Sequence, residues 1–196
     1  MKTVKDRQSG FTLLEAVFVL GFAMTLMSFA IYQGVNTLSN YRANAAQDVV
    51  VTALRQARLV SITQRRDVQV WVEQTVTAPG QVPSINYQIV PLGNEPPQPP
   101  MKFLFPQGTQ MVLEPGIPDT PMAFGNSAPV YIGDVSGGPK VMVFHPDGEF
   151  TDPNYNLLNG SIFIGVPNQP GSARAVTIMG GIGCIDHFTW VGTRWE

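Results

Sequence analysis

Residues 10–32 read GFTLLEAVFVLGFAMTLMSFAIY, an apolar run that follows a short polar leader. From Phe11 to Tyr41 the only charged residue is Glu15. About 20 apolar helical residues cross the hydrocarbon core of a bilayer at ~1.5 Å per residue, so this run predicts a membrane-spanning helix. A carboxylate near the start of such a span is costly and indicates a function.

The leader predicts the direction in which the chain crosses the membrane. It carries three cations and one anion (Lys2, Lys5, Arg7 and Asp6). A net positive flank places the N-terminus in the cytoplasm and the bulk of the chain outside. A secretory signal is cleaved after its apolar stretch, whereas here the small residue Gly10 precedes it. Cleavage at Gly10 leaves the apolar segment on the mature chain, with Phe11 as its first residue. The alternative is a single-pass anchor that keeps its leader.

The junction from Gly10 to Glu15 resembles the class III signal of type IV prepilins and pseudopilins. The resemblance implies that prepilin peptidase cuts after Gly10 and methylates Phe11, and that Glu15 neutralises the free amine of a neighbouring subunit in a fibre. An ammonium group and a carboxylate are both expensive in lipid, and pairing them offsets part of that cost. The implied partners are the peptidase, other pilin or pseudopilin subunits and the inner membrane. Alternatively, the Glu15 side chain snorkels to water and pairs with nothing.

Proline and glycine divide the chain. All 17 prolines lie from Pro79 onward, and 16 of the 19 glycines lie from Gly80 onward. Because both residues interrupt helices, the first 78 residues can be largely helical and the remainder cannot. The expected organisation is a leader (1–10), a transmembrane or assembly helix (11–35), an amphipathic stalk half of the same helix (36–66) and one extracytoplasmic β-rich domain (67–196).

The stalk half shows the spacing of a helix with one buried face. Apolar or small residues recur at Ala46, Val50, Ala53, Leu54, Ala57 and Val60. The charged residues fall mainly elsewhere on the helical wheel, at Asp48, Arg55, Arg58, Arg65 and Arg66. A solvated helix face explains these cations better than a patch for nucleic acid or lipid.

After Arg66 the period changes from helical to alternating, as in a strand with one buried face. Nine short strands are expected: 68–73, 86–92, 101–105, 110–113, 130–132, 140–144, 161–166, 174–179 and 184–191. The proline-rich stretch 93–100 predicts an exposed extended loop. The predicted fold class is therefore α+β, a long N-terminal helix packed on a C-terminal antiparallel β-sheet domain, and the resemblance implies the pilin-like fold.

Two segments resemble the GspH/FimT family of minor pseudopilins and minor pilins. These are the strand and Pro-Asp-Gly turn at 140–148 and the strand, glycine turn and final hairpin at 174–195. Some members bind DNA through Gly-Arg-x-Arg in that hairpin, but this chain reads Gly183-Cys184-Ile185-Asp186. Without its leader the chain keeps nine cations and thirteen anions, a net charge of −4. DNA is therefore not an expected partner, and no nucleic-acid-binding residue is assigned.

Other chemistry is sparse. A single Cys184 excludes an intrachain disulfide and is expected to be a buried thiol. A metal site or hydrolytic triad built from His145, His187, Asp147 and Asp186 lacks any known spacing, so the histidines are interpreted as structural. A solvated loop is favoured over a calcium loop for the oxygen-bearing residues Asp147, Glu149, Asp152, Asn154 and Asn156. No enzyme activity, cofactor, metal or catalytic residue is expected.

The leading hypothesis is a structural subunit. The resemblances of the chain imply a minor pseudopilin or minor pilin that supports fibre assembly and protein secretion. This subunit would lie at or near the tip of a type II secretion pseudopilus or a type IV pilus. It would be a single-pass protein of the bacterial inner membrane, with the C-terminal domain periplasmic or extracytoplasmic. The alternatives are a pilin-like binding module that presents loops to DNA or another ligand, and an anchored β domain unrelated to fibres. The sequence leaves open whether the machine is a pilus, a secretion system or a competence system.

Overall fold

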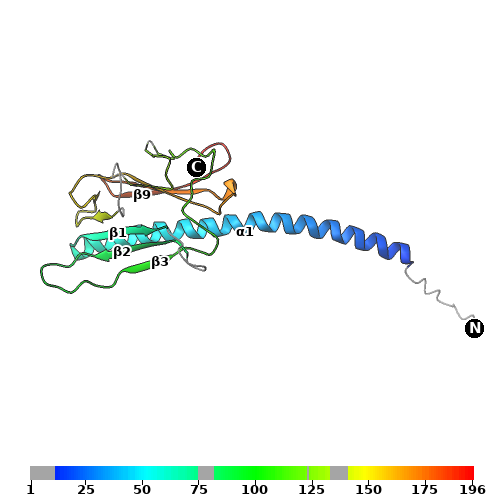
Figure 1. The fold of residues 1–196 in the computed structure, drawn as a ribbon, viewed down its shortest axis with the longest axis horizontal. Helices are drawn as coiled ribbons and strands as arrows, with labels where there is room; N and C mark the ends of the chain where they lie inside the picture. Colours follow the sequence, from blue (N-terminus) through cyan, green and yellow to red (C-terminus); the bar gives the residue numbers. More distant parts are fainter. Residues whose placement is uncertain (1–11, 75–81, 123, 133–140) are drawn as a thin grey trace, which may run out of the picture. The chain divides into compact units, whose positions relative to one another are not determined.

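The structure is a computed structural model that describes residues 12–74, 82–122, 124–132 and 141–196. Within those residues, one α-helix, α1 (Leu13–Gln64), is followed by nine strands and a single 3-10 turn, η1 (Pro170–Ser172). The contacts divide the chain into two compact units, Met1–Leu38 and Ser39–Glu196. In the second unit, the helix lies between strands of two antiparallel sheets (Figure 1). The predicted α+β class is confirmed, because the helix packs on antiparallel sheets.

Both ends of α1 are capped. At the N-terminal end, Thr12 precedes the first helical residue, and the amide of Ala16 donates to the carbonyl of Thr12 at 3.1 Å. At the other end, Arg65 adopts a positive φ of 51°, and the amide of Arg66 donates back to the carbonyl of Ser61 at 3.1 Å. This is the hydrogen bond of a Schellman motif, which stops a helix by satisfying one of its last carbonyls. The helix therefore ends at Gln64, two residues before the predicted end at residue 66.

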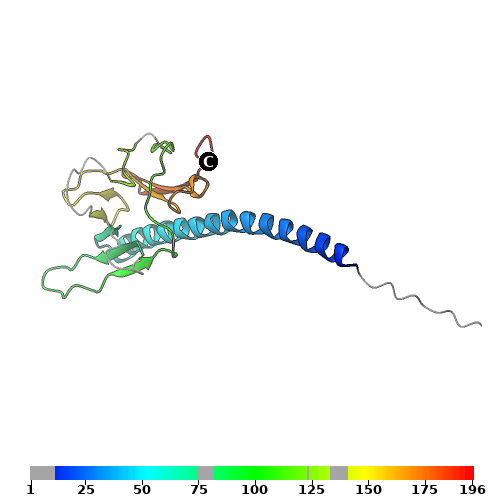
Figure 2. The ribbon, with the colours of Figure 1, turned by 45° about the vertical axis from the view of Figure 1, so that its right-hand side comes forward.

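The strands form two sheets in which every pair is antiparallel. The five-stranded sheet has the order β3 (Met101–Leu104), β2 (Ser84–Ile89), β1 (Val68–Glu73), β5 (Met142–Phe144) and β6 (Phe150–Thr151). The four-stranded sheet has the order β4 (Val130–Ile132), β7 (Gly160–Ile164), β8 (Arg174–Met179) and β9 (Cys184–Thr189). Figure 2 shows β1, β2 and β3 on one side of the helical half that belongs to this unit, and β8 and β9 on the other. Sequence neighbours such as β8 and β9 pair through tight turns, with Met179 opposite Cys184.

Most of the expected strands are present. The alternation at 68–73 is confirmed, since Val68 and Val70 are buried in β1. The strand expected at 110–113 is wrong, because only Gln110 makes a bridge there, to Gly165. The two-residue β6 was missed. Phe150 is fully buried against the ring of Phe144, with ring centroids 5.0 Å apart, and a strand this short has no readable alternation. The loop 93–100 is exposed throughout, as predicted.

The apolar stripe on the helix is the centre of the core. Its first five predicted positions are fully buried, and Val60 is partly buried against the same cluster. Their neighbours in the core come from both sheets, including Val68 of β1, Phe144 of β5 and Ile178 of β8. The compact unit accordingly begins at Ser39, inside the helix, whereas the sequence placed the start of the β-rich domain at residue 67 and treated 36–66 as a stalk.

A buried glutamine fixes the helix on the second sheet. The side-chain Nε2 of Gln47 donates to the carbonyls of Ala175 (3.1 Å) and Phe188 (2.9 Å), which face each other across β8 and β9. Because a buried amide without partners is costly, these bonds fix how the helix lies on the sheet. The sequence pattern gave no sign of this contact, since a glutamine beside an apolar stripe usually faces solvent.

The turn between β8 and β9 has no room for a side chain at its first glycine. A Cβ added at Gly180 would lie 2.2 Å from the carbonyl oxygen of Leu158 and 2.8 Å from its amide nitrogen, and both are backbone atoms. At Gly181 the nearest atom would be a Leu157 methyl carbon at 3.9 Å. We expect Gly180→Ala to lower the free energy of unfolding by about 1–3 kcal/mol, and Gly181→Ala to change it far less. Denaturant unfolding of the two variants checks this, and equal stabilities would contradict it.

Candidate functional site

The apolar helix begins with a reciprocal cap built from Thr12 and Glu15. The amide of Glu15 donates to the Thr12 hydroxyl at 3.3 Å, while a Glu15 carboxylate oxygen accepts from the Thr12 amide at 3.2 Å and from its hydroxyl at 3.1 Å. This arrangement is a capping box, which satisfies two backbone donors that a helix start leaves free. The predicted processing residues Gly10 and Phe11 lie outside the described residues. Of the three predicted site residues, the structure therefore describes the contacts of Glu15.

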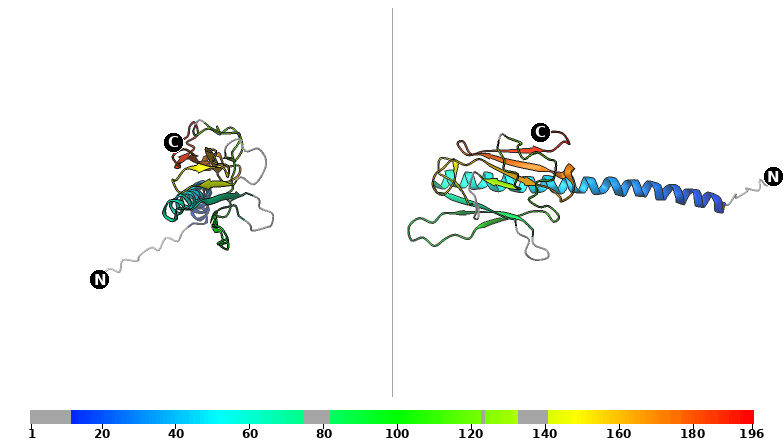
Figure 3. Two further views of the ribbon diagram at one scale, coloured as in Figure 1. Left: turned by 90° about the vertical axis from the view of Figure 1, so that its left-hand side faces the viewer. Right: turned by 45° about the horizontal axis from the view of Figure 1, so that its top comes forward.

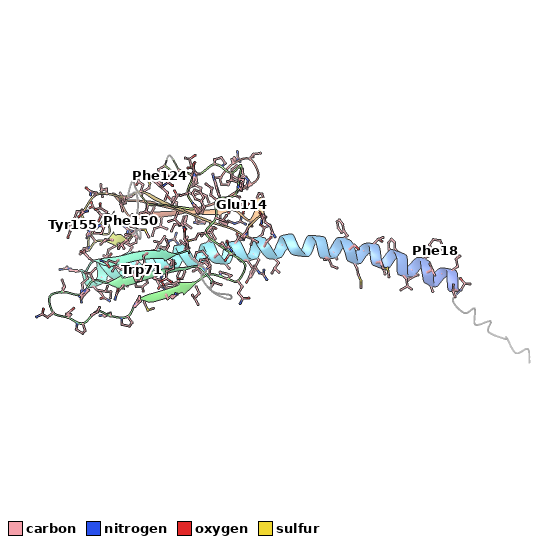
Figure 4. All side chains as sticks on the ribbon, viewed as in Figure 1. Phe18, Trp71, Glu114, Phe124, Phe150 and Tyr155 are labelled. Carbon is pink, nitrogen blue, oxygen red and sulfur yellow. The ribbon has the colours of Figure 1, made fainter. Side chains whose placement is uncertain are left out.

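The rest of this segment is suited to lipid. Leu13–Ile31 is long and apolar enough to cross a membrane, and its large side chains are exposed, as Figure 4 shows for Phe18. The segment contains three polar side chains, and each has an internal partner. Glu15 bonds to Thr12, the Thr25 hydroxyl donates to the carbonyl of Phe22 at 2.7 Å, and the Ser28 hydroxyl donates to the carbonyl of Met24 at 2.9 Å. A hydrocarbon environment requires this internal satisfaction, since it offers no water to polar groups.

In the second unit, Arg58 of α1 joins the two turns that carry the GspH/FimT resemblance. Its Nε donates to the carbonyl of Gly148 at 3.2 Å, and its Nη2 donates to the carbonyl of Ile182 at 2.9 Å. The Pro-Asp-Gly turn and the glycine turn are thereby held against the helix. The interpretation of Arg58 as part of a purely solvated face is wrong, and sequence spacing carried no signal for this role.

Arg66 departs from the same interpretation. Its Nη2 donates to the carbonyl of Val90 at 2.8 Å and pairs with the Glu95 carboxylate at 2.7 Å. The hydrogen bond from Arg66 lowers the pKa of the Glu95 carboxyl. Asp48, Arg55 and Arg65 are exposed, as expected for a solvated face.

The two cations near the C-terminus are already engaged. Arg174 is buried and donates from Nε to Asn44 at 2.7 Å and from Nη1 to the carbonyls of Ala173 (2.9 Å) and Gly171 (3.3 Å). Desolvation by burial lowers the pKa of its guanidinium. Arg194 donates from Nε to the Glu196 carboxylate at 2.8 Å. Both guanidinium groups therefore already have hydrogen-bond partners, whereas a DNA contact requires a guanidinium that can bond to a phosphate.

The structure does not bring together the histidines and aspartates considered as a metal site or triad. His145 Nδ1 lies 2.7 Å from Asp67, and its Nε2 lies 2.7 Å from the Thr151 hydroxyl, which donates to the carbonyl of Asp152 at 2.8 Å. The imidazole also stacks on Tyr155, with ring centroids 4.4 Å apart (Figure 4 labels Tyr155). Since Thr151 is 1% exposed, its hydroxyl is not accessible to a substrate. The hydrogen bonds of His145 instead hold Asp67, at the start of β1, against the 145–155 loop.

The loop considered for calcium is ordered by its own hydrogen bonds. The Asp152 carboxylate accepts from the amides of Asn154 (2.7 Å) and Asn156 (2.9 Å) and from the Asn156 side chain (2.8 Å). These bonds, the side-chain bond from Asn156 most of all, lower the pKa of the Asp152 carboxyl. Among the described residues, no three histidine, cysteine, aspartate or glutamate side chains lie close enough together to hold a metal ion. Cys184 is partly buried, whereas a fully buried thiol was expected.

Comparisons with known proteins add one likeness. No protein-family model matches this chain, and no curated protein matches it in sequence. Among solved structures, the crystal structure of the type IV minor pilin FimU from Pseudomonas aeruginosa (strain PAO1) is similar to it, with 14% identity and a TM-score of 0.43. The match covers 80% of this chain and 93% of that chain. A likeness of this size carries no conclusion about the activity or partners of this chain.

Proposed function

We propose that this chain is a pilin-like structural subunit, a minor pilin or minor pseudopilin, that is held in the inner membrane by α1 and packs through the same helix on other subunits. The observation that carries the proposal is the segment Leu13–Ile31. It is apolar and exposed, and its three polar side chains are satisfied inside the helix. Such a segment needs an apolar environment, which lipid or the helices of neighbouring subunits would provide.

In this proposal, Glu15 pairs one subunit with the next during assembly. Its carboxylate sits in the first turn of the helix and accepts two hydrogen bonds from Thr12. The capping box fixes its position, and a charged oxygen pair can accept further bonds. In the proposed fibre, the amine of Phe11 from a neighbouring subunit pairs with this carboxylate after cleavage at Gly10. The pairing compensates two charges that are costly in an apolar helix bundle.

The second unit would then form the extracytoplasmic part, facing the periplasm or the exterior, at or near the tip of a pilus or a secretion pseudopilus. Presentation of loops to DNA has less support as a function of this unit. Arg174 is buried among carbonyls, and Arg194 is paired with Glu196. The terminal region thus offers no free arginine pair in the described residues.

The mature N-terminus tests the proposal directly. We expect intact-mass and peptide spectra of the chain from a host with prepilin peptidase to show a first residue of methylated Phe11. The same chain from a host lacking the peptidase should keep Met1 and the whole leader. An unprocessed N-terminus in both hosts would favour a plain membrane anchor and count against a pilin-like subunit.

A further inference from the structure

A groove runs between α1 and the turn that leads into β9. It is an open groove with a volume of about 450 Å³, lined on the helix side by Arg55, Arg58, Leu59 and Ile62 and on the other side by Gly183, Cys184 and Ile185. The walls contain exposed apolar side chains, since Leu59 is 60% and Ile62 is 40% exposed. The groove lies wholly within the unit Ser39–Glu196.

One wall of this groove ends in an open sheet edge. β9 is the last strand of its sheet, and its inner side pairs with β8. Thr189 turns its amide and carbonyl to the outer side, where both bond to Glu196, at 2.7 and 3.0 Å. Because backbone groups alternate along a strand, Ile185 and His187 present their amides and carbonyls to the same outer side. No strand in the described part of the chain pairs with them.

The helix packs across the face of β8 and β9, along the length of β9. Gln47 bonds to Phe188 near the end of the strand, and Arg58 bonds to Ile182 just before its start. Helix and strand therefore run in opposite directions. The right view of Figure 3 shows the sheet that contains β9, drawn in orange and red, extending along the helix. A chain that added to β9 would be flanked by the helix face that carries Arg55 and Leu59. A groove between an edge strand and a helix is a geometry that accepts an extended peptide.

The charge of the groove selects among such peptides. The Arg55 side chain is exposed, and Arg58 uses its guanidinium only on backbone carbonyls. Neither arginine has a carboxylate within ion-pair distance among the residues that the structure describes. Asp186, the acidic residue of β9, alternates with Ile185 and so lies on the opposite face of the strand. The groove thus combines apolar walls with two uncompensated positive charges in a chain of net charge −2.

We propose that this groove binds an extended segment of a partner protein, in which an acidic side chain is flanked by apolar ones. The segment adds to β9 as a further strand through the free groups of Ile185 and His187. Its apolar side chains fill the space between Leu59, Ile62 and Ile185, and its carboxylate pairs with Arg55. Main-chain bonds provide the binding, and the arginine and apolar walls provide the selection. The proposal does not depend on fibre assembly, since it concerns a surface of the second unit alone.

Selection from displayed random peptides tests the groove. The full chain, purified in detergent micelles, is exposed to a library of peptides about eight residues long, a little longer than β9 with its six residues. We expect enrichment of sequences that alternate apolar residues and carry at least one aspartate or glutamate. A synthetic enriched peptide is then measured by fluorescence anisotropy on the parent chain and its variants.

The variants separate the groove from general charge effects. Arg55→Glu should weaken binding by about tenfold or more, the effect of reversing one close charge pair. The matched control Arg42→Glu makes the same charge change at an exposed position of the same helix and should leave binding unchanged. Since both side chains are exposed, both variants should keep the melting temperature of the parent.

Further measurements test whether the ligand binds by strand addition and whether it is a peptide. Methylating the backbone nitrogens of the peptide that face β9 should abolish binding, because strand addition needs those donors. Failure to enrich any peptide over empty micelles, or equal affinity of parent and Arg55→Glu for the enriched peptide, would overturn the proposal. A third result would also overturn the proposal: no peptide binds, but a labelled single-stranded oligonucleotide binds the parent chain and not Arg55→Glu. Nucleic acid would then be the ligand.

Discussion

A fragment that begins at Asp67 is expected to be unfolded, whereas a fragment that begins at Ser39 is expected to fold. The reason is that residues 39–64 of α1 belong to the core of the β domain. Ala46, Val50, Leu54 and Ala57 are fully buried against both sheets, and Gln47 bonds to β8 and β9. Truncating one buried leucine alone typically costs about 2–5 kcal/mol, while a whole domain is stable by only about 5–15 kcal/mol.

Heteronuclear NMR spectra of the two fragments check this expectation. The Ser39–Glu196 fragment should give dispersed amide signals and a cooperative thermal transition. The Asp67–Glu196 fragment should give collapsed signals, bind a hydrophobic dye and show no transition. A folded Asp67–Glu196 fragment would mean that the sheets form a core without the helix, which the burial of Leu54 and Ala57 argues against.

The second large effect is expected at Glu15, where three substitutions separate charge from capping. Glu15→Ala removes the carboxylate and the reciprocal bond to Thr12, while Glu15→Gln removes the charge but keeps an acceptor suited to a capping box. If the carboxylate pairs with the amine of a neighbouring subunit, both variants leave one buried ammonium without its counter-charge. Such a loss typically costs about 3–5 kcal/mol, so incorporation into fibres should fall by at least about a hundredfold in both. Glu15→Asp, which keeps the charge, should retain part of the incorporation.

Immunoblots of sheared or detergent-extracted fibres measure incorporation, and carbonate extraction of membranes measures insertion. All three variants should still insert, since Glu15→Ala and Glu15→Gln make Leu13–Ile31 more apolar and Glu15→Asp leaves its charge unchanged. Normal incorporation of Glu15→Gln together with failure of Glu15→Ala would show that the cap, and not the charge, matters. Normal incorporation of both would contradict the proposed role of Glu15.

Local periodicity predicted a large share of the fold. The spacing of Ala46, Val50 and Leu54 predicted the buried helix face, and the alternation from Val68 predicted β1. Prolines and glycines correctly marked the exposed loop 93–100. These features were readable because each depends on residues close in sequence, whose side chains share a face of one helix or strand.

The features that the sequence missed depend on contacts between distant residues. Arg58 looked like a solvent-facing cation, yet it bonds to Gly148 and Ile182, which lie 90 and 124 positions away. Arg174 of β8 is buried, and its Nε donates to Asn44 of the helix, 130 positions away. The segment 110–113 has strand-forming residues but bonds only to Phe163 and Gly165, because β4 already occupies that side of β7 at residues 160–162. No local pattern distinguishes these outcomes.

The candidate site, like the fold, has features that depend on local sequence and features that depend on distant contacts. The sequence by itself determined the apolar segment and its lone carboxylate, because both depend on residues within a few turns of one helix. Only the tertiary structure decided that residues 39–64 complete the β domain and that Arg55 and Arg58 stand beside the open edge of β9. The physical reason is that a helix can satisfy its own backbone and short side chains locally. A sheet edge and a groove exist only after strands from distant parts of the chain have paired and left one side open.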